Sequence, residues 1–279
     1  MNYIKTGLLL VVLTMLFVLV GGYFGGREGA VYAFIFAFVI NMISYWFSDK
    51  IVLMLYKAKE ANVNEVPEIY NIVKELVIAA NIPMPKIYIA PQDSPNAFAT
   101  GRSPKYAAVC VTQGILNLLD RGELKGVIAH ELSHIKNRDT LIMTVAATIA
   151  GAITMIANWA RWAAIFGTRG SRDRGGNGIG MLVMLIVAPI AAMLIQLAIS
   201  RSREYAADKR GAQIAGSSMG LSHALLKLEK GSKVYPMDAN QATAHLFIVN
   251  PLSSGAIAAL FSTHPPIKER VKRLESMII

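Results

Sequence analysis

Two histidines four positions apart, with a glutamate between them, give the chain its clearest chemical signal. The pentapeptide His-Glu-Leu-Ser-His at 130–134 lies within a segment, 121–138, whose apolar residues recur at helical spacing. Histidines four apart on a helix project from one face and can share a metal ion. A catalytic zinc ion takes three protein ligands and keeps one position open for water, from which a neighbouring glutamate can take a proton. The segment therefore predicts a zinc site with His130 and His134 as ligands and Glu131 as the catalytic base.

A third ligand must come from another part of the chain. The candidates are the acidic residues after the last apolar run and three further histidines, His223, His245 and His264. Glu204 is the best of these, because Asp208 follows it by one helical turn. One carboxylate can then bind the metal while the other accepts a hydrogen bond from a histidine ligand and orients its ring. We therefore expect one zinc ion per chain, held by Glu204 and the two histidines of the motif.

The composition indicates a membrane protein. Of the 279 residues, 54% are hydrophobic and 16% are charged, whereas charged residues make up about a quarter of soluble domains. The apolar residues are concentrated in long runs, as in bilayer spans. The net charge of +10 comes without a basic stripe or a base-reading motif, so we expect no nucleic-acid partner. Positive charge beside apolar runs instead favours contact with the lipid bilayer.

Two apolar runs at the start of the chain predict a helical hairpin. The first covers 6–20 and ends in a glycine-rich stretch, and the second covers 30–47, which is long enough to span a bilayer. Tyr45 and Trp46 end the second run, as in an interfacial aromatic belt. A cleaved signal peptide followed by one anchor is the alternative, but the first run lacks a clear small-residue cleavage site. We therefore expect an uncleaved transmembrane hairpin over residues 1–47.

Residues 48–140 mix charged and apolar positions and predict the first part of a catalytic domain. An apolar face at helical spacing covers 69–77, and the segments 86–90 and 106–112 have the composition of short strands. The stretch 91–96 between the two strands is rich in turn residues. A small β-sheet is therefore expected beside the histidine helix.

Two further apolar runs, 141–166 and 179–199, predict a second hairpin, joined by the basic stretch 167–177. If both runs cross the membrane, this basic loop lies opposite the main domain, against the positive-inside tendency. Either the hairpin is only partly inserted, or the basic content of the flanking domain overrides the loop. An even number of crossings returns the chain to the same membrane face, so the histidine motif and Glu204 can meet there.

Together these elements predict an integral membrane α+β protein, mainly helical, with two hydrophobic hairpins. Its catalytic domain is expected to be zincin-like and to carry a small β-sheet. The domain would form in two parts, 48–140 with the histidine helix and 200–279 with the third zinc ligand. The second hairpin, 141–199, separates these parts along the chain.

The histidine motif, the following Lys136-Asn-Arg-Asp139 and the later Arg203-Glu-Tyr-Ala-Ala-Asp208 resemble the HtpX family of heat-shock membrane proteases, which is related to the CAAX prenyl proteases. The resemblance covers essentially the whole chain. It implies a zinc endopeptidase that degrades damaged membrane proteins and unfolded polypeptides in stress-response quality control. It also implies a multi-pass protein of the bacterial inner membrane, with the catalytic domain facing the cytoplasm and other membrane quality-control proteases as partners. A prenylated CAAX substrate is the alternative within the wider family.

A further match to the family suggests where substrate binds. The stretch Asn96-Ala-Phe-Ala is similar to a family element beside an edge strand, and an exposed edge can hold a substrate in extended form by adding it as a strand. The resemblance thus implies substrate contacts from Asn96, Ala97 and Phe98, with 106–112 as the candidate edge strand. The alternative, that Asn96 only closes a turn, stays open.

His264 and Asp139 take roles from the same resemblance, and Asp208 keeps the role that its helical spacing gives it. His264 lies in a Thr-His-Pro-Pro element, where it would hydrogen-bond the oxyanion or transiently occupy the metal. Asp139 and Asp208 would orient the histidine ligands by accepting hydrogen bonds from the ring nitrogens that do not bind the metal.

Two other classes of protein compete with a protease. A membrane chaperone or scaffold would have a purely structural zinc ion with a fourth protein ligand, for which His264 is the candidate. A transporter would need ionisable groups inside the membrane, and the apolar runs carry almost no charge apart from Arg161.

Overall fold

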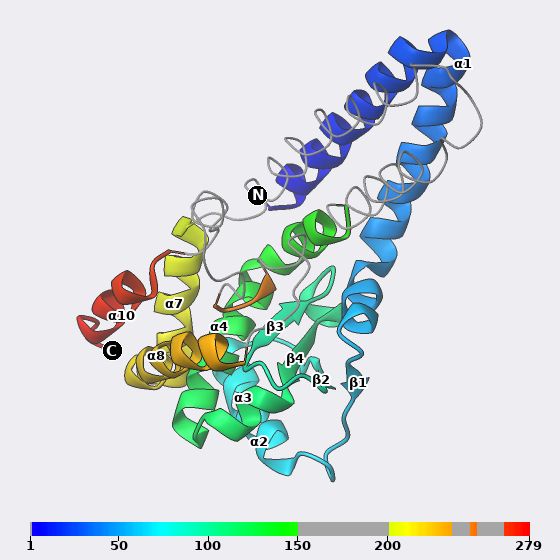
Figure 1. The fold of residues 1–279 in the computed structure, drawn as a ribbon. Helices are drawn as coiled ribbons and strands as arrows, with labels where there is room; N and C mark the ends of the chain where they lie inside the picture. Colours follow the sequence, from blue (N-terminus) through cyan, green and yellow to red (C-terminus); the bar gives the residue numbers. More distant parts are fainter. Residues whose placement is uncertain (1, 150–200, 236–245, 250–264) are drawn as a thin grey trace.

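The structure, a computed structural model, describes residues 2–149, 201–235, 246–249 and 265–279 (Figure 1). A long helical hairpin projects from a body in which helices pack around a small sheet. In chain order the elements are α1 (Asn2–Leu55), β1 (Lys59–Glu60), α2 (Pro67–Ala80), β2 (Lys86–Ala90), β3 (Ala97–Thr100), the 3-10 turn η1 (Pro104–Tyr106), β4 (Ala108–Thr112), α3 (Gln113–Leu118), α4 (Arg121–Asn137), α7 (Arg201–Ala215), α8 (Met219–Val234) and α10 (Ile267–Glu275). A further apolar helix, Asp139–Ile149, follows α4.

Helix α1 folds back on itself because the chain reverses at Gly26. The backbone there has φ 58° and ψ −145°, a conformation that glycine adopts without strain. The two legs lie side by side (Figure 1), and the Asn41 side-chain amide donates to the Thr14 hydroxyl across them at 2.8 Å. Among the described residues, the second leg, Gly25–Leu55, is the one helix long and apolar enough to cross a membrane. The fold-back lies within the range 1–47 in which a hairpin was expected, and α1 continues to Leu55.

The sheet has the strand order β1-β2-β4-β3, with β2 and β4 parallel and the other pairs antiparallel. The expected strand at 86–90 is present as β2. The expected strand at 106–112 begins later, at Ala108, because residues 104–106 form a 3-10 turn. Mostly helical elements with a small mixed sheet agree with the expected α+β class.

The expectation that 106–112 forms the edge of the sheet was wrong. Strand β4 lies between β2 and β3, and Ala97–Thr100 forms the outer strand instead. This strand could not be predicted from the sequence, because the strand has only four residues and directly follows a stretch rich in turn residues. The edge beside the histidine helix is therefore β3.

The sheet separates two apolar clusters, as the alternation of side chains along a strand requires. Val109 and Val111 face α2 and α4, and the predicted face of α2 is buried in this cluster. Phe98 and Cys110 face the other way, where they join the base of the α1 hairpin and the helix Asp139–Ile149. Burial raises the pKa of the Cys110 thiol. The N-terminal hairpin is thus packed directly onto the face of the sheet opposite α4.

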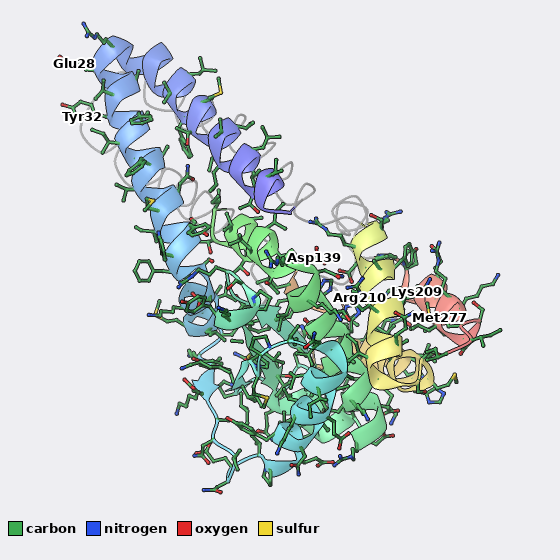
Figure 2. All side chains as sticks on the ribbon, turned by 180° about the vertical axis from the view of Figure 1, so that it is seen from behind. Glu28, Tyr32, Asp139, Lys209, Arg210 and Met277 are labelled. Carbon is green, nitrogen blue, oxygen red and sulfur yellow. The ribbon has the colours of Figure 1, made fainter. Side chains whose placement is uncertain are left out.

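The second hairpin expected over 141–199 would start within the described helix Asp139–Ile149. Its remaining residues, 150–199, lie outside the described part of the chain, as does His264. In Figure 2, Glu28 and Tyr32 mark the far tip of the N-terminal hairpin, and Asp139 lies near its base.

Candidate metal centre

Helix α4 holds the histidine motif deep in the body. It starts with a capping box, in which the Asp120 side chain accepts from the Glu123 backbone and the Glu123 side chain accepts from the Asp120 backbone. Its apolar residues pack on the sheet and on α2, α7 and α8. His130, Glu131 and His134 are all buried as a result. The predicted helix is therefore confirmed, and it presents both imidazoles on one side.

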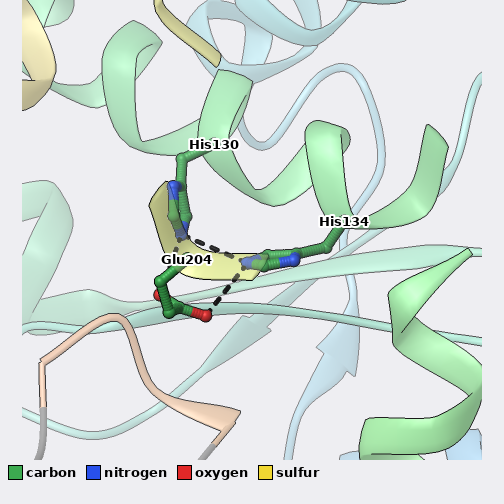
Figure 3. A group of neighbouring side chains, drawn as sticks. All are labelled: His130, His134 and Glu204. Atoms are coloured by element: carbon green, nitrogen blue, oxygen red, sulfur yellow. Dashed lines mark hydrogen bonds and ion pairs between the residues drawn. The ribbon is translucent and has the colours of Figure 1, made fainter. Parts of the chain in front are cut away.

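Helix α7 brings Glu204 to the two histidines (Figure 3). The Nε2 atoms of His130 and His134 are 3.2 Å apart. Glu204 Oε2 lies 3.7 Å from His130 Nε2, and Glu204 Oε1 lies 3.6 Å from His134 Nε2. One ligand atom from each side chain lies within 4.8 Å of the others. The structure thus brings together the three residues expected to hold the metal.

The Nδ1 atom of each imidazole faces a carboxylate. That carboxylate determines the orientation of the ring and therefore the direction of the Nε2 atom. His130 Nδ1 lies 3.0 Å from Asp208 Oδ1, and His134 Nδ1 lies 3.3 Å from Asp139 Oδ2. We infer that each Nδ1 carries a proton that faces its carboxylate, which leaves both Nε2 atoms directed at Glu204 and available to a metal. Two ring nitrogens face each other at this distance only when a proton or a metal ion lies between them. The donor set therefore fits a metal ion.

Arg270 from α10 packs against Asp208 and was not identified from the sequence. Its Nε donates to Asp208 Oδ2 at 2.9 Å, and its Nη2 donates to Asp208 Oδ1 at 2.6 Å. Its Nη1 donates to the Ile248 carbonyl at 3.0 Å and lies 3.8 Å from Glu204 Oε2. The side chain is 0% exposed. A signal was present, because Arg270 lies on the same helical face as Val271 and Leu274, and a cation on an apolar face needs a buried partner.

The buried charges shift one another's protonation. Burial alone would raise the pKa of Asp208, but Arg270 and His130 lower it to about 2. Burial lowers the pKa of His130. It would also lower that of His134, but Asp139 and Glu204 raise the pKa of this imidazole to about 9. Burial raises the pKa of Glu131 to about 8. Such shifted groups in one cluster are typical of a reactive site.

Glu131 faces the edge strand β3. The Ala99 backbone N–H donates to its carboxylate, and Ala99 lines the same small cavity as Glu131. The Asn96 side-chain oxygen accepts from the backbone N–H of Ala97 at 2.8 Å, at the start of the strand. The Phe98 side chain instead packs against Tyr56, with ring centroids 5.5 Å apart. Of the three residues expected to bind substrate, Phe98 could therefore contribute only its main chain.

A short segment, Leu246–Val249, covers the metal centre and was also missed from the sequence. All of its side chains are buried, and the Ile248 N–H donates to the Asn96 side-chain oxygen at 3.3 Å. The cavity at the metal ligands is also lined by three residues of this segment, Leu246, Phe247 and Ile248. The cavity that remains is about 10 Å³, room for about one water molecule. The Glu131 side chain is buried in this conformation.

A glycine lets α7 approach α4 at the first histidine. A Cβ atom built on Gly211 would lie 2.9 Å from the His130 Cα, which is backbone and cannot yield as a flexible side chain would. We expect Gly211→Val to push α7 away and to weaken zinc binding by about tenfold, since overpacking costs about 1–3 kcal/mol. Zinc content after dialysis against limiting zinc measures this. Ala206→Val, on the exposed face of α7, is the matched control and should retain full zinc; equal zinc in both variants would contradict the argument.

Comparisons with known proteins show the family to which the chain belongs. Residues 64–278 match the model of peptidase family M48. A protein named Protease HtpX homolog from Syntrophotalea carbinolica is 55% identical over 281 residues, covering 100% of both chains. The Thermodesulfovibrio yellowstonii protein of the same name is 57% identical over 278 residues, covering 99% of both. The resemblance to the HtpX family is therefore confirmed.

A solved structure shows the same fold at much lower sequence identity. The crystal structure of Ste24p from S. mikatae is 18% identical, with a TM-score of 0.54. The match covers 98% of this chain but 65% of that one, so this chain spans just under two thirds of its length. The metal-ligand cluster lies inside the residues that match the family. The chain belongs to peptidase family M48 and is a membrane metalloprotease.

Proposed function

We propose that this chain is a zinc endopeptidase that cleaves misfolded or damaged membrane proteins in stress-response quality control. The observation that carries the proposal is the meeting of His130, His134 and Glu204 beside Glu131, at the edge strand of the sheet. Among the described residues this cluster has three ligands, the number typical of a catalytic zinc site.

Two imidazoles and one carboxylate suit zinc better than magnesium or calcium, which prefer oxygen ligands. Zinc bound there would supply Lewis-acid activation of water and of the scissile carbonyl. Glu131 takes the proton from the attacking water and returns it to the leaving amine. Asp208 and Asp139 hold the Nδ1 protons of the two histidines, so that both Nε2 atoms remain available to the metal.

The edge strand suggests the form in which substrate binds. An extended peptide could pair with β3 by main-chain hydrogen bonds, which require no particular side chains. Glu131 lies against this strand at Ala99, so a paired peptide would pass the catalytic base. Most backbone groups in a folded domain are already hydrogen-bonded within that domain, whereas those of an unfolded segment are free to pair. The geometry therefore supports unfolded polypeptide as the substrate class.

The covering segment Leu246–Val249 adds a second requirement. It lines the cavity at the metal ligands and is held by Asn96 and Arg270. A substrate must displace it before its backbone can reach Glu131. An extended apolar segment could displace Leu246–Val249 by binding to the same apolar residues. Side chains on the surface of a folded protein could not.

The location follows from the hairpin and from the family resemblance. The proposal takes the protein as multi-pass in a bacterial inner membrane, with the catalytic domain on the cytoplasmic face. The hairpin packs directly onto the sheet, which favours cleavage close to the membrane surface. Other membrane quality-control proteases are the partners proposed from the same resemblance.

Metal removal and restoration test the proposal. Detergent-purified protein should contain about one zinc ion per chain and hydrolyse casein. A strong chelator should abolish hydrolysis, and zinc, but not magnesium, should restore it. His130→Ala should lose both zinc and activity. His223→Ala, at an exposed position on α8, should lose neither. Casein hydrolysis by metal-free protein would overturn the proposal.

A further inference from the structure

Arg102 is held between two aromatic rings at the base of the membrane hairpin. Its guanidinium carbon lies 3.8 Å from the centroid of the Tyr106 ring and 4.8 Å from that of the Trp46 ring. Trp46 belongs to the second leg of α1, whereas Arg102 and Tyr106 belong to the connection between β3 and β4. Figure 1 shows this connection beside the lower part of that leg. The stack therefore joins the catalytic domain to the hairpin.

The position of Trp46 along α1 corresponds to the membrane surface. The helix from Glu28, at the far tip of the hairpin (Figure 2), to Trp46 carries no charged residue between its ends. It is about 27 Å long at about 1.5 Å per residue, close to the roughly 30 Å of a bilayer's hydrocarbon core. The first charges after it are Asp49 and Lys50. Trp46, and with it Arg102, would thus lie at the level of the lipid head groups.

Within the described part of the chain, the ring contacts of Arg102 are to Trp46 and Tyr106. Among the described residues, no carboxylate forms an ion pair with Arg102. The two rings remain open to their surroundings, with Trp46 46% and Tyr106 56% exposed. Lys105, next to Tyr106 in the chain, is also exposed. An oriented guanidinium of this kind still has donors available for a phosphate.

We propose that Arg102, Trp46 and Tyr106 bind the head-group phosphate of an anionic phospholipid. Arg102 supplies the charge and the hydrogen-bond donors, and the two rings fix the plane of its guanidinium and contact the lipid beside it. Lys105 adds a second positive charge to the same connection. The partner is a lipid because the site lies where the charge-free span ends.

The lipid site has a consequence for catalysis. The connection that carries Arg102 directly follows β3, the strand that faces Glu131. A bound head group therefore fixes the edge strand at the membrane surface. A segment that leaves the bilayer would meet the strand there. The inference goes beyond the proposed function and requires only that α1 spans a membrane.

Lipid preference measured at Trp46 tests the inference without any readout of proteolysis. The chain has three tryptophans, so Trp159→Phe and Trp162→Phe leave Trp46 as the only reporter. The protein is reconstituted in vesicles that contain brominated phosphatidylglycerol or brominated phosphatidylcholine, and fluorescence quenching gives their relative binding constants. We expect a preference of about fivefold for phosphatidylglycerol, the size expected for one cation near the surface.

Arg102→Gln should reduce this preference to less than about twofold. Lys74→Gln, which removes an exposed charge from α2 on the body of the protein, is the matched control and should leave it unchanged. Inorganic phosphate at millimolar concentration should not compete. Equal binding of the two lipids by the parent protein, an unchanged preference in Arg102→Gln, or competition by free phosphate would each overturn the inference. Because casein hydrolysis is not measured, failure here is distinguishable from failure of the proposed protease.

Discussion

Glu131→Gln is expected to lower kcat for casein by at least about 1,000-fold while zinc content stays at the parent level. Glutamine has nearly the same shape but cannot take a proton from water, and general base catalysis contributes about 10²–10⁴-fold. Glu131 is not one of the three grouped metal ligands. Kinetics with casein and zinc analysis on the same preparation measure both effects.

The matched control is Glu68→Gln, an exposed glutamate in the first turn of α2. It should retain both activity and zinc. Hydrolysis by Glu131→Gln at the parent rate would show that another group is the base. Loss of zinc in Glu131→Gln would show that this carboxylate helps to hold the metal.

The direction of the pH dependence follows from the same carboxylate. Burial raises the pKa of Glu131 to about 8 in the metal-free site. Only the deprotonated form can act as a base, so activity should rise with pH along the acid limb. A bound cation favours the charged form, so the limb of the zinc enzyme should lie below this value.

Helices α4 and α7 could be predicted from the sequence, because the metal site requires its residues at a fixed spacing along each helix. His130 and His134 are local to one helix, and Glu204 and Asp208 are local to another, so each pair follows from helical periodicity alone. Their meeting in space then followed from the need for a third ligand. The structure brings these residues together without changing either pair.

The parts that sequence reasoning missed depend on contacts between distant segments. The short strand β3 is defined by its pairing with β4 and carries too little pattern of its own. The cover Leu246–Val249 is an ordinary apolar stretch until Arg270 and Asn96 bind it. No local periodicity encodes such long-range pairings, and an arginine on the apolar face of a helix was their one visible sign.

Arg270→Gln is expected to weaken zinc binding by about 10–100-fold, the usual cost of removing a group that orients a metal ligand. Arg270 makes two hydrogen bonds to Asp208, which in turn faces His130 Nδ1. Without the guanidinium, Asp208 is a buried carboxylate that has lost its main counter-charge, and breaking such a pair costs about 3–5 kcal/mol. Competition with a chromogenic chelator measures the zinc affinity.

Lys272→Gln is the matched control, because Lys272 lies on the same helix at an exposed position. It should bind zinc as the parent does. Arg270→Lys keeps the charge but cannot form the paired hydrogen bonds, so it should restore only part of the affinity.

A general loss of stability must be distinguished from a specific effect on the metal site. If Arg270 acts on zinc through Asp208, removing both partners leaves no unpaired charge, so Arg270→Gln with Asp208→Asn should weaken binding by less than the product of the single effects. If instead α10 merely supports the fold, the two effects multiply, and Arg270→Gln lowers the unfolding temperature equally with and without zinc. Full zinc affinity in Arg270→Gln would refute the role, because the bonds between Arg270 and Asp208 would then have no influence on His130.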